Sequence, residues 1–155
     1  FSNYFVGRNE FEGWQSQQIS ERDGFFKVRT DLLGTKVGKS DDWLMALNFS
    51  ADIPDKINPL KVLPFELPLK VFADFGTYSE AWKDDNPSGS FLYDAGIQLS
   101  LLKGLVNIYA PIFYSKVYGD YFKSTLGEKR FLKTLSFDIN LQVFKLNNLF
   151  PEIPL

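Results

Sequence analysis

The sequence predicts an all-β fold, in which an antiparallel meander of about six strands forms most of the chain. Three observations predict it. Apolar and polar residues alternate with a period of two over several stretches of eight or more residues, as on the two faces of a strand. The polar positions of the best stretches carry almost no charge. The connections also sort by length, with a short turn at one end of the predicted sheet and long loops at the other.

The composition limits the possible functions. At 155 residues the chain is long enough for one domain, so residues 1–155 are taken as a single β domain. Aromatic residues make up 17% of the chain, a high fraction that suits strands and membrane interfaces. A net charge of −2 without a basic stripe argues against a nucleic-acid partner. Because the chain has no Cys and no His, thiolates, His triads and Cys/His zinc sites are excluded, and no catalytic residue, metal or cofactor is predicted.

Six stretches alternate clearly, and a weaker alternation around 4–8 predicts one further short strand. The six are 25–32, 43–53, 69–76, 91–101, 106–114 and 134–144. In 134–144 every odd position from Leu135 to Val143 is apolar and every even position up to Gln142 is polar. In 106–114 the predicted apolar face consists of Val106, Ile108, Ala110, Ile112 and Tyr114.

The connections suggest how the sheet is oriented. Residues 54–68 contain four prolines and cannot be a central strand. Lys103-Gly104 predicts a tight hairpin, whereas 79–90 and 115–133 are long loops at the opposite end of the sheet, and no helix is predicted. Short periplasmic turns and long external loops are typical of outer-membrane barrels. Lys103-Gly104 would then face the periplasm, together with 54–68, which is long for such a turn.

The polar faces separate a membrane barrel from a soluble β-sandwich or lipid-binding barrel, which would show the same alternation. Across 44–52, 92–100 and 134–142, the fifteen positions of the polar face hold no Lys, Arg or Glu. A soluble surface usually shows several such charges, whereas the confined lumen of a barrel favours groups that hydrogen-bond to one another. We therefore predict the C-terminal part of a bacterial outer-membrane β-barrel, with the lipid bilayer as its partner.

This prediction assigns residues to two faces. The residues predicted to face the lumen are Asp74, Asp94, Gln98, Asp138 and Asn140. The residues predicted to face lipid are Ile97, Leu99, Phe137, Ile139 and Leu141.

Six strands are too few to close a membrane barrel, for which about eight is the smallest number. The chain also begins with Phe1 rather than Met and shows no signal peptide. We therefore expect it to be a fragment of a larger chain, and the remainder of its own barrel or chain to be a partner.

Four short motifs carry a family resemblance. They are N-F-S-A-D-I-P at 48–54, F-A-D-F-G at 72–76, D-A-G-I-Q-L-S at 94–100 and L-V-N-I-Y-A-P at 105–111. In this order, and followed by the terminal alternating strand, they resemble the last strands of the surface-antigen barrels, which assemble or secrete proteins at the outer membrane. The resemblance implies an assembly or secretion pore.

A second resemblance involves R-N-E-F-E-G-W-Q-S-Q-Q at 8–18 and R-D-G-F-F-K at 22–27. These runs are similar to the C-terminal part of membrane-associated gluzincin-type aminopeptidases from Bacteroidetes-like bacteria. The catalytic H-E-x-x-H motif of such a metallopeptidase is absent from this chain, so any peptidase activity would belong to an upstream domain.

Three smaller features have plain interpretations that we prefer. Asp84-Asp85-Asn86 offers oxygen ligands to calcium, but without the spacing of a calcium loop it indicates a solvated turn. Asp74 and Asp94 could form a selectivity feature in the lumen, but structural pairing with Lys70 or Arg29 is the simpler interpretation. Gly-Glu-Lys-Arg at 127–130 could touch lipid phosphates or be an ordinary charged loop.

Three functional hypotheses follow. The first is a membrane-embedded segment that anchors or scaffolds a larger bacterial outer-membrane protein. The second is an assembly or secretion pore. The third is a soluble β-domain that binds an apolar ligand or a partner domain.

Overall fold

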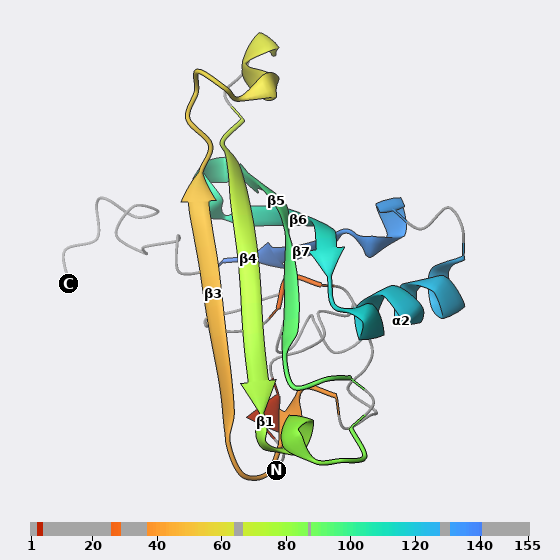
Figure 1. The fold of residues 1–155 in the computed structure, drawn as a ribbon. Coiled ribbons are helices and arrows are strands. Elements are labelled where there is room, and N and C mark those ends of the chain that lie inside the picture. The colour runs from red at the N-terminus through yellow and green to blue at the C-terminus, as the bar shows by residue number, and fades with distance from the viewer. Residues whose placement is uncertain are drawn as a thin grey trace, which may run out of the picture.

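The computed structural model describes residues 3–4, 26–28, 37–63, 67–86, 88–127 and 131–140. Five strands form one antiparallel sheet in the order β3-β4-β5-β6-β7, so each strand pairs with its neighbours along the chain (Figure 1). Their bounds are Leu44–Asp52, Leu69–Tyr78, Leu92–Leu101, Val106–Tyr114 and Ser136–Ile139. The predicted all-β antiparallel meander is confirmed. A two-residue pair, β1 (Asn3–Tyr4) with β2 (Lys39–Ser40), lies outside this sheet.

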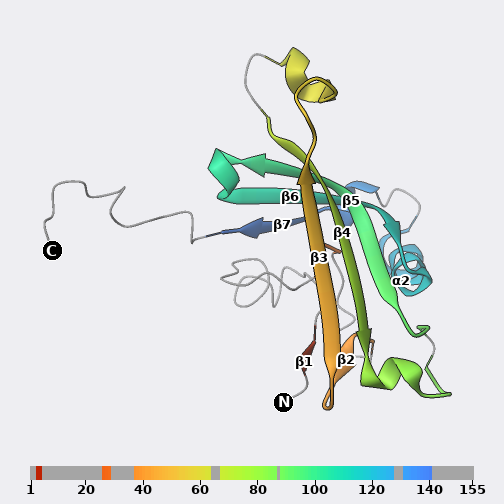
Figure 2. The same ribbon diagram turned by 60° about the vertical axis from the view of Figure 1, so that its left-hand side comes forward.

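The sheet is curled into a half-barrel with one concave and one convex face. Its strands turn progressively from the direction of β3 to that of β7, as the right-handed twist of strands requires (Figure 2). The β3–β4 and β4–β5 ladders keep one register throughout, for example Asn48↔Asp74↔Asp94. Consequently the even-numbered residues of β3, β4 and β5 share the concave face, and the odd-numbered residues share the convex face.

The β5–β6 ladder contains a bulge. Ala95 pairs with Phe113 and Gly96 pairs with Pro111, so Ile112 has no partner in β5. Gly96 is required here because a Cβ atom at this position would lie 2.0 Å from the carbonyl oxygen of Ala110. The bulge moves the β6 alternation by one residue.

The shifted alternation corrects one prediction. Tyr114 was expected to continue the apolar face of β6, but it is partly buried and packs edge-on against Phe122, with ring centroids 5.2 Å apart. Phe113, on the opposite face, is 68% exposed. The extra residue in β6 changes which side chains reach each face, and alternation alone could not reveal it.

The connections lie at the two ends of the sheet. We call one end the turn end, because it carries the β3–β4 connection with the 3-10 turn η2 (Pro59–Val62) and the β5–β6 turn η4 (Leu102–Gly104). The opposite end, the helix end, carries η3 (Ser79–Trp82) and α2 (Lys116–Leu126). The tight hairpin predicted at Lys103-Gly104 is confirmed, since Leu101 pairs with Val106.

The helix α2 was not predicted, because residues 115–133 were expected to form a loop. Its aromatic and β-branched residues have modest helix propensity, and Gly119 lowers it further. Spacing explains the helix: Tyr118 and Phe122 are four residues apart, lie on one helix face and are both fully buried. None of the helices in the described residues is long and apolar enough to cross a membrane.

Two further strand predictions need correction. Within the stretch 25–32, residues 26–28 are not a strand; they form a buried segment on the concave side of the sheet, and the rest of the stretch is outside the described residues. In the stretch 134–144 the strand β7 begins at Ser136 rather than at Thr134, because Thr134 is the last residue of a 3-10 turn, η5 (Phe131–Thr134). Residues 141–144 are outside the described part of the chain.

Candidate functional site

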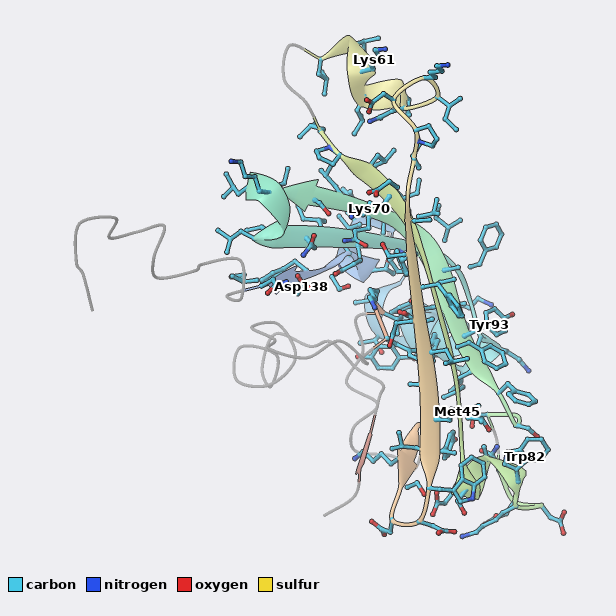
Figure 3. All side chains as sticks on the ribbon, turned by 90° about the vertical axis from the view of Figure 1, so that its left-hand side faces the viewer. Met45, Lys61, Lys70, Trp82, Tyr93 and Asp138 are labelled. Atoms are coloured by element: carbon cyan, nitrogen blue, oxygen red, sulfur yellow. The ribbon has the colours of Figure 1, made fainter. Side chains whose placement is uncertain are left out.

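The convex face of the sheet is apolar and exposed. Figure 3 shows Met45 and Tyr93 pointing away from the sheet on one side, with Asp138 on the other. Phe49 on this face is 59% exposed and Val71 is 45% exposed. The exposed apolar residues of this face are Met45, Leu47, Phe49, Val71, Phe75, Tyr93, Ile97 and Phe113.

The concave face is polar and buried. Asp74 and Asp94 are each only 1% exposed. The buried polar residues that the strands contribute to this face are Asp74, Asp94, Gln98, Ser100, Asn107, Ser136 and Asp138. The sheet therefore exposes apolar side chains on its convex face and buries polar ones on its concave face, together with Phe72, Leu92 and Tyr109.

The predicted site residues divide between these two faces. Four residues expected on the polar side, Asp74, Asp94, Gln98 and Asp138, are buried on the concave face. Asn140, the fifth, is partly buried just beyond β7, where its backbone N–H donates to the carbonyl oxygen of Leu105 (2.7 Å). The convex side carries Ile97, Leu99, Phe137 and Ile139, all exposed or partly exposed, and Leu141 is outside the described residues.

A buried ion pair occupies the centre of the concave face. The Asp74 carboxylate accepts hydrogen bonds from the backbone N–H of Lys27 (2.7 Å), from Lys27 Nζ (3.1 Å) and from Asn48 Nδ2 (2.6 Å). Both charged side chains are almost fully shielded from solvent. Of the two partners expected for Asp74, Lys70 pairs instead with Asp52 (3.0 Å) near the surface of the turn end. Arg29, the other expected partner, is outside the described residues.

A second network joins β5, β6 and β7 on the same face. The Tyr109 hydroxyl and the Asn107 amide both donate to the Asp138 carboxylate, at 2.6 and 2.8 Å. The Asn107 side-chain oxygen accepts from Ser100 (2.8 Å) and from Gln98 (3.1 Å). These bonds satisfy polar groups that would be costly to bury alone.

Residues 26–28, which we call the strap, tie the two networks together. Besides holding Asp74 of β4, Lys27 accepts a hydrogen bond at its carbonyl oxygen from Ser136 of β7 (2.6 Å). Its ammonium group lies 6.0 Å from the centre of the Tyr109 ring in β6. The strap thus spans the concave face from β4 to β7. The alternation predicted a strand over 25–32, and no local pattern in the sequence indicates this role of Lys27.

Beyond the strap, the helix end of the concave face is closed by an apolar cluster. Phe26 packs edge-on against Tyr118 of α2, with ring centroids 6.3 Å apart. The buried members of the cluster are Phe26, Val28, Val37, Tyr78, Ala81, Leu92, Tyr118 and Phe122. The strap, α2 and the strand ends therefore form a plug on the inner side of the half-barrel.

Tyr118 has an unusual environment within this plug. Its hydroxyl is buried and has no hydrogen-bond partner among the described residues. Burial, followed by the negative charge of Asp94 and smaller effects of Tyr78 and Asp74, raises the pKa of Tyr118 well above its usual value. The phenol is thus kept neutral in the folded chain.

Aromatic residues gather on the convex side at the helix end. The Phe91 ring stacks on Phe75 (5.2 Å between centroids) and meets the edge of Trp82 (5.4 Å), which is 57% exposed. The Trp82 indole N–H donates to the Thr77 hydroxyl (2.9 Å). The three rings therefore form an exposed apolar cluster, and the hydrogen bond to Thr77 also fixes the orientation of the Trp82 ring.

The described residues contain no group of three or more acidic residues able to hold a metal ion. Asp84 and Asp85 are exposed. The Asn86 amide donates to the carbonyl oxygens of Ala81 (2.9 Å) and Gly89 (2.8 Å), which are turn-forming contacts. The charged stretch Gly-Glu-Lys-Arg at 127–130, which could touch lipid phosphates, is described only at Gly127.

Comparison with known proteins identifies nothing further: no family model, curated protein or solved structure matches the chain.

Proposed function

We propose that this sheet is a membrane-embedded segment of a bacterial outer-membrane β-barrel, which anchors or scaffolds a larger protein. The observation that supports the proposal most strongly is the inverted sheet, with exposed apolar side chains on the convex face and a hydrogen-bonded polar interior. In water, exposed Phe49 and Val71 would be unfavourable, and Asp74 and Asp138 would be buried beside few large apolar side chains, chiefly Phe72 and Tyr109, at the centre of the sheet. In lipid, the same arrangement is favourable.

The dimensions of the sheet support the same proposal. The strand β4 has 10 residues, which at a tilt near 45° span about 23 Å of membrane thickness, close to the roughly 25 Å apolar band of such barrels. At the helix end, the Trp82–Phe91–Phe75 cluster resembles an interfacial aromatic girdle. At the turn end, the ion pair between partly buried Lys70 and exposed Asp52 suits the boundary with water.

The plug favours an anchor over a pore. A conduit needs a wet path through its interior, whereas the strap and α2 fill the helix end of the concave face with Phe26, Tyr118 and Phe122, each 0% exposed. The lysine–aspartate pair at the centre is equally closed. The soluble alternative would need an apolar ligand or a partner domain to cover the exposed convex face.

Substitution on the convex face tests the proposal. Ile97 is in the middle of β5 and 36% exposed, so Ile97→Arg would place a charge near the middle of the membrane. We expect a loss of about 2–4 kcal/mol in folding free energy, measured by urea unfolding in lipid vesicles. Asp85→Arg, in the exposed helix-end connection, serves as the control and should have little effect. If Ile97→Arg is as harmless as Asp85→Arg, the convex face is in water and the proposal fails.

A further inference from the structure

The β3–β4 connection is far longer than a barrel turn needs to be. Its described parts, 53–63 and 67–68, form what we call the arm, which projects past the ends of β3 and β4 (Figures 1 and 2). We propose that the arm and the β5–β6 turn together bind anionic lipid headgroups at the turn end, with apolar side chains in the interface and lysines on the phosphates. This inference rests on the proposed function, because it assumes that the neighbouring sheet is in the membrane.

The arm holds its own shape. The Asn58 side chain accepts from the backbone N–H of Leu60 (2.9 Å) and donates to the carbonyl oxygen of Leu67 (3.0 Å), which ties the two sides of the arm together. The backbone N–H of Ile57 donates to the carbonyl oxygen of Pro54 (2.9 Å). The arm therefore satisfies several of its backbone groups locally, which lowers the cost of moving it out of bulk water.

The arm and the β5–β6 turn share a pattern of exposed apolar residues beside lysines. In the arm, Ile57 is 71% exposed and follows Lys56, and Val62 is 89% exposed and follows Lys61. Figure 3 shows Lys61 at the far tip of the arm. In the turn, Leu102 is 70% exposed and precedes Lys103.

An apolar residue beside a cation is the combination that binds the headgroup region. The apolar side chain enters the boundary of the acyl chains, while the ammonium group stays with the phosphates. Over the whole β3–β4 connection Lys56 and Lys61 are balanced by Asp55 and Glu66, and Lys103 adds one positive charge in the β5–β6 turn, so the attraction to phosphates depends on where the lysines lie and not on a net positive charge of the arm.

The backbone of the β5–β6 turn adds independent support. Leu102 and Lys103 both have positive φ angles, 51° and 59°, a conformation that residues other than glycine rarely adopt. Glycine or asparagine would form this turn with less strain. This strained backbone presents an exposed leucine beside a lysine, a pair of side chains that suits the headgroup region.

Continuity with the convex face favours lipid over a protein partner. The arm leaves directly from β3 and β4, and the convex residues near that end, Phe49 and Val71, are themselves exposed. The exposed apolar residues of the turn end are also divided between two separate connections rather than gathered in one patch. A broad, flat lipid surface can contact both connections, whereas a protein groove would suit a single cluster.

Fluorescent labelling tests the inference cleanly, because the chain contains no Cys and a single introduced thiol can be labelled uniquely. We would label Val62→Cys with an environment-sensitive dye and reconstitute the full chain in vesicles of phosphatidylcholine, with or without phosphatidylglycerol. Nitroxide lipids labelled either at the headgroup or deep in the acyl chain would serve as quenchers. We expect a blue-shifted emission in phosphatidylglycerol vesicles and stronger quenching by the headgroup nitroxide. In the same vesicles, Lys56→Gln and Lys61→Gln should each weaken binding of the arm about five-fold.

A control label separates this inference from the function on which it rests. Phe49→Cys on the convex face should be quenched best by the deep nitroxide. If the Phe49 label is not quenched, the proposed function itself fails. If the Phe49 label is quenched but the Val62 label keeps a water-like emission in both vesicles, the arm is in water and only this inference is overturned. A Val62 label that is shielded in native membranes but not in vesicles would also overturn it, in favour of a protein partner.

Discussion

At the scale of single residues, the Lys27–Asp74 pair determines how the strap is held. Asp74 accepts three hydrogen bonds, and two of them come from Lys27. A buried ion pair contributes little net stability compared with apolar packing, but the loss of one partner leaves an uncompensated charge in a dry site. The sequence predicted that Asp74 would face the polar lumen of a barrel. It could not predict the partner, which is 47 residues away and belongs to no recognisable motif.

We therefore expect Lys27→Met to lower the folding free energy by about 3–5 kcal/mol, because Asp74 would lose its counter-charge. Asp74→Asn should cost a similar amount. The double variant should recover part of the loss, because neither residue then carries a charge. Urea unfolding of the four proteins in vesicles measures all three changes, and strictly additive losses would contradict the pairing.

Tyr118 gives the fold a dependence on alkaline pH. Its pKa is raised in the folded chain, so the folded state holds this proton more tightly than the unfolded state does. The resulting stability is fully present below the ordinary tyrosine pKa of about 10 and is lost as the pH rises from there toward the folded-state value. Circular dichroism from pH 8 upward should show stability falling beyond about pH 10. Tyr118→Phe should reduce this fall, and an unchanged profile would contradict the assignment.

At the scale of elements, the four long strands were predicted to within about two residues, because alternation is a local property that survives in the folded chain. The helix α2 was missed because only two of its side chains are fully buried, and their partners, such as Phe26, come from distant segments. The bulge in β6 was missed because its cause, the close approach of Gly96 to Ala110, is a contact between strands.

Two glycines should therefore respond in opposite ways to alanine. At Gly96 the added methyl group would collide with the backbone of Ala110, which cannot yield without breaking the β5–β6 ladder, so we expect a loss of about 1–3 kcal/mol. At Gly119, within α2, the nearest atom is a side-chain carbon of Tyr114 at 3.3 Å. Because the ring can shift, the gain in helix propensity should prevail, by up to about 1 kcal/mol. Thermal unfolding of both variants tests the contrast, which equal losses would contradict.

At the scale of the whole molecule, the inverted sheet and the interior plug have different sources in the sequence. The inversion was visible in advance, because the polar faces lacked Lys, Arg and Glu. The plug was not, because it joins segments far apart along the chain, such as Phe26 with Tyr118. The two features also bear on different questions. The inverted sheet concerns whether the chain lies in a membrane, and the plug concerns whether ions or proteins could pass through the barrel.

The plug predicts that the protein conducts poorly. In planar bilayers we expect no steady current from the unaltered protein, because the strap and α2 fill the helix end of the interior. Phe26→Ala combined with Phe122→Ala should introduce intermittent openings, whereas Phe113→Ala on the convex face should not. A stable open channel in the unaltered protein would favour the assembly or secretion pore over the anchor.

The hydrogen bond from Ser136 to Lys27 spans 109 residues, and this separation has a consequence for the order of folding. Contacts so distant along the chain form late, because a long loop must close first. The strap is held by Asp74 of β4 and by Ser136 of β7. Its binding site is therefore incomplete until β7 has paired with β6. The early segment 26–28 must therefore wait for the end of the chain. Its docking would therefore report that the strands from β4 to β7 have paired.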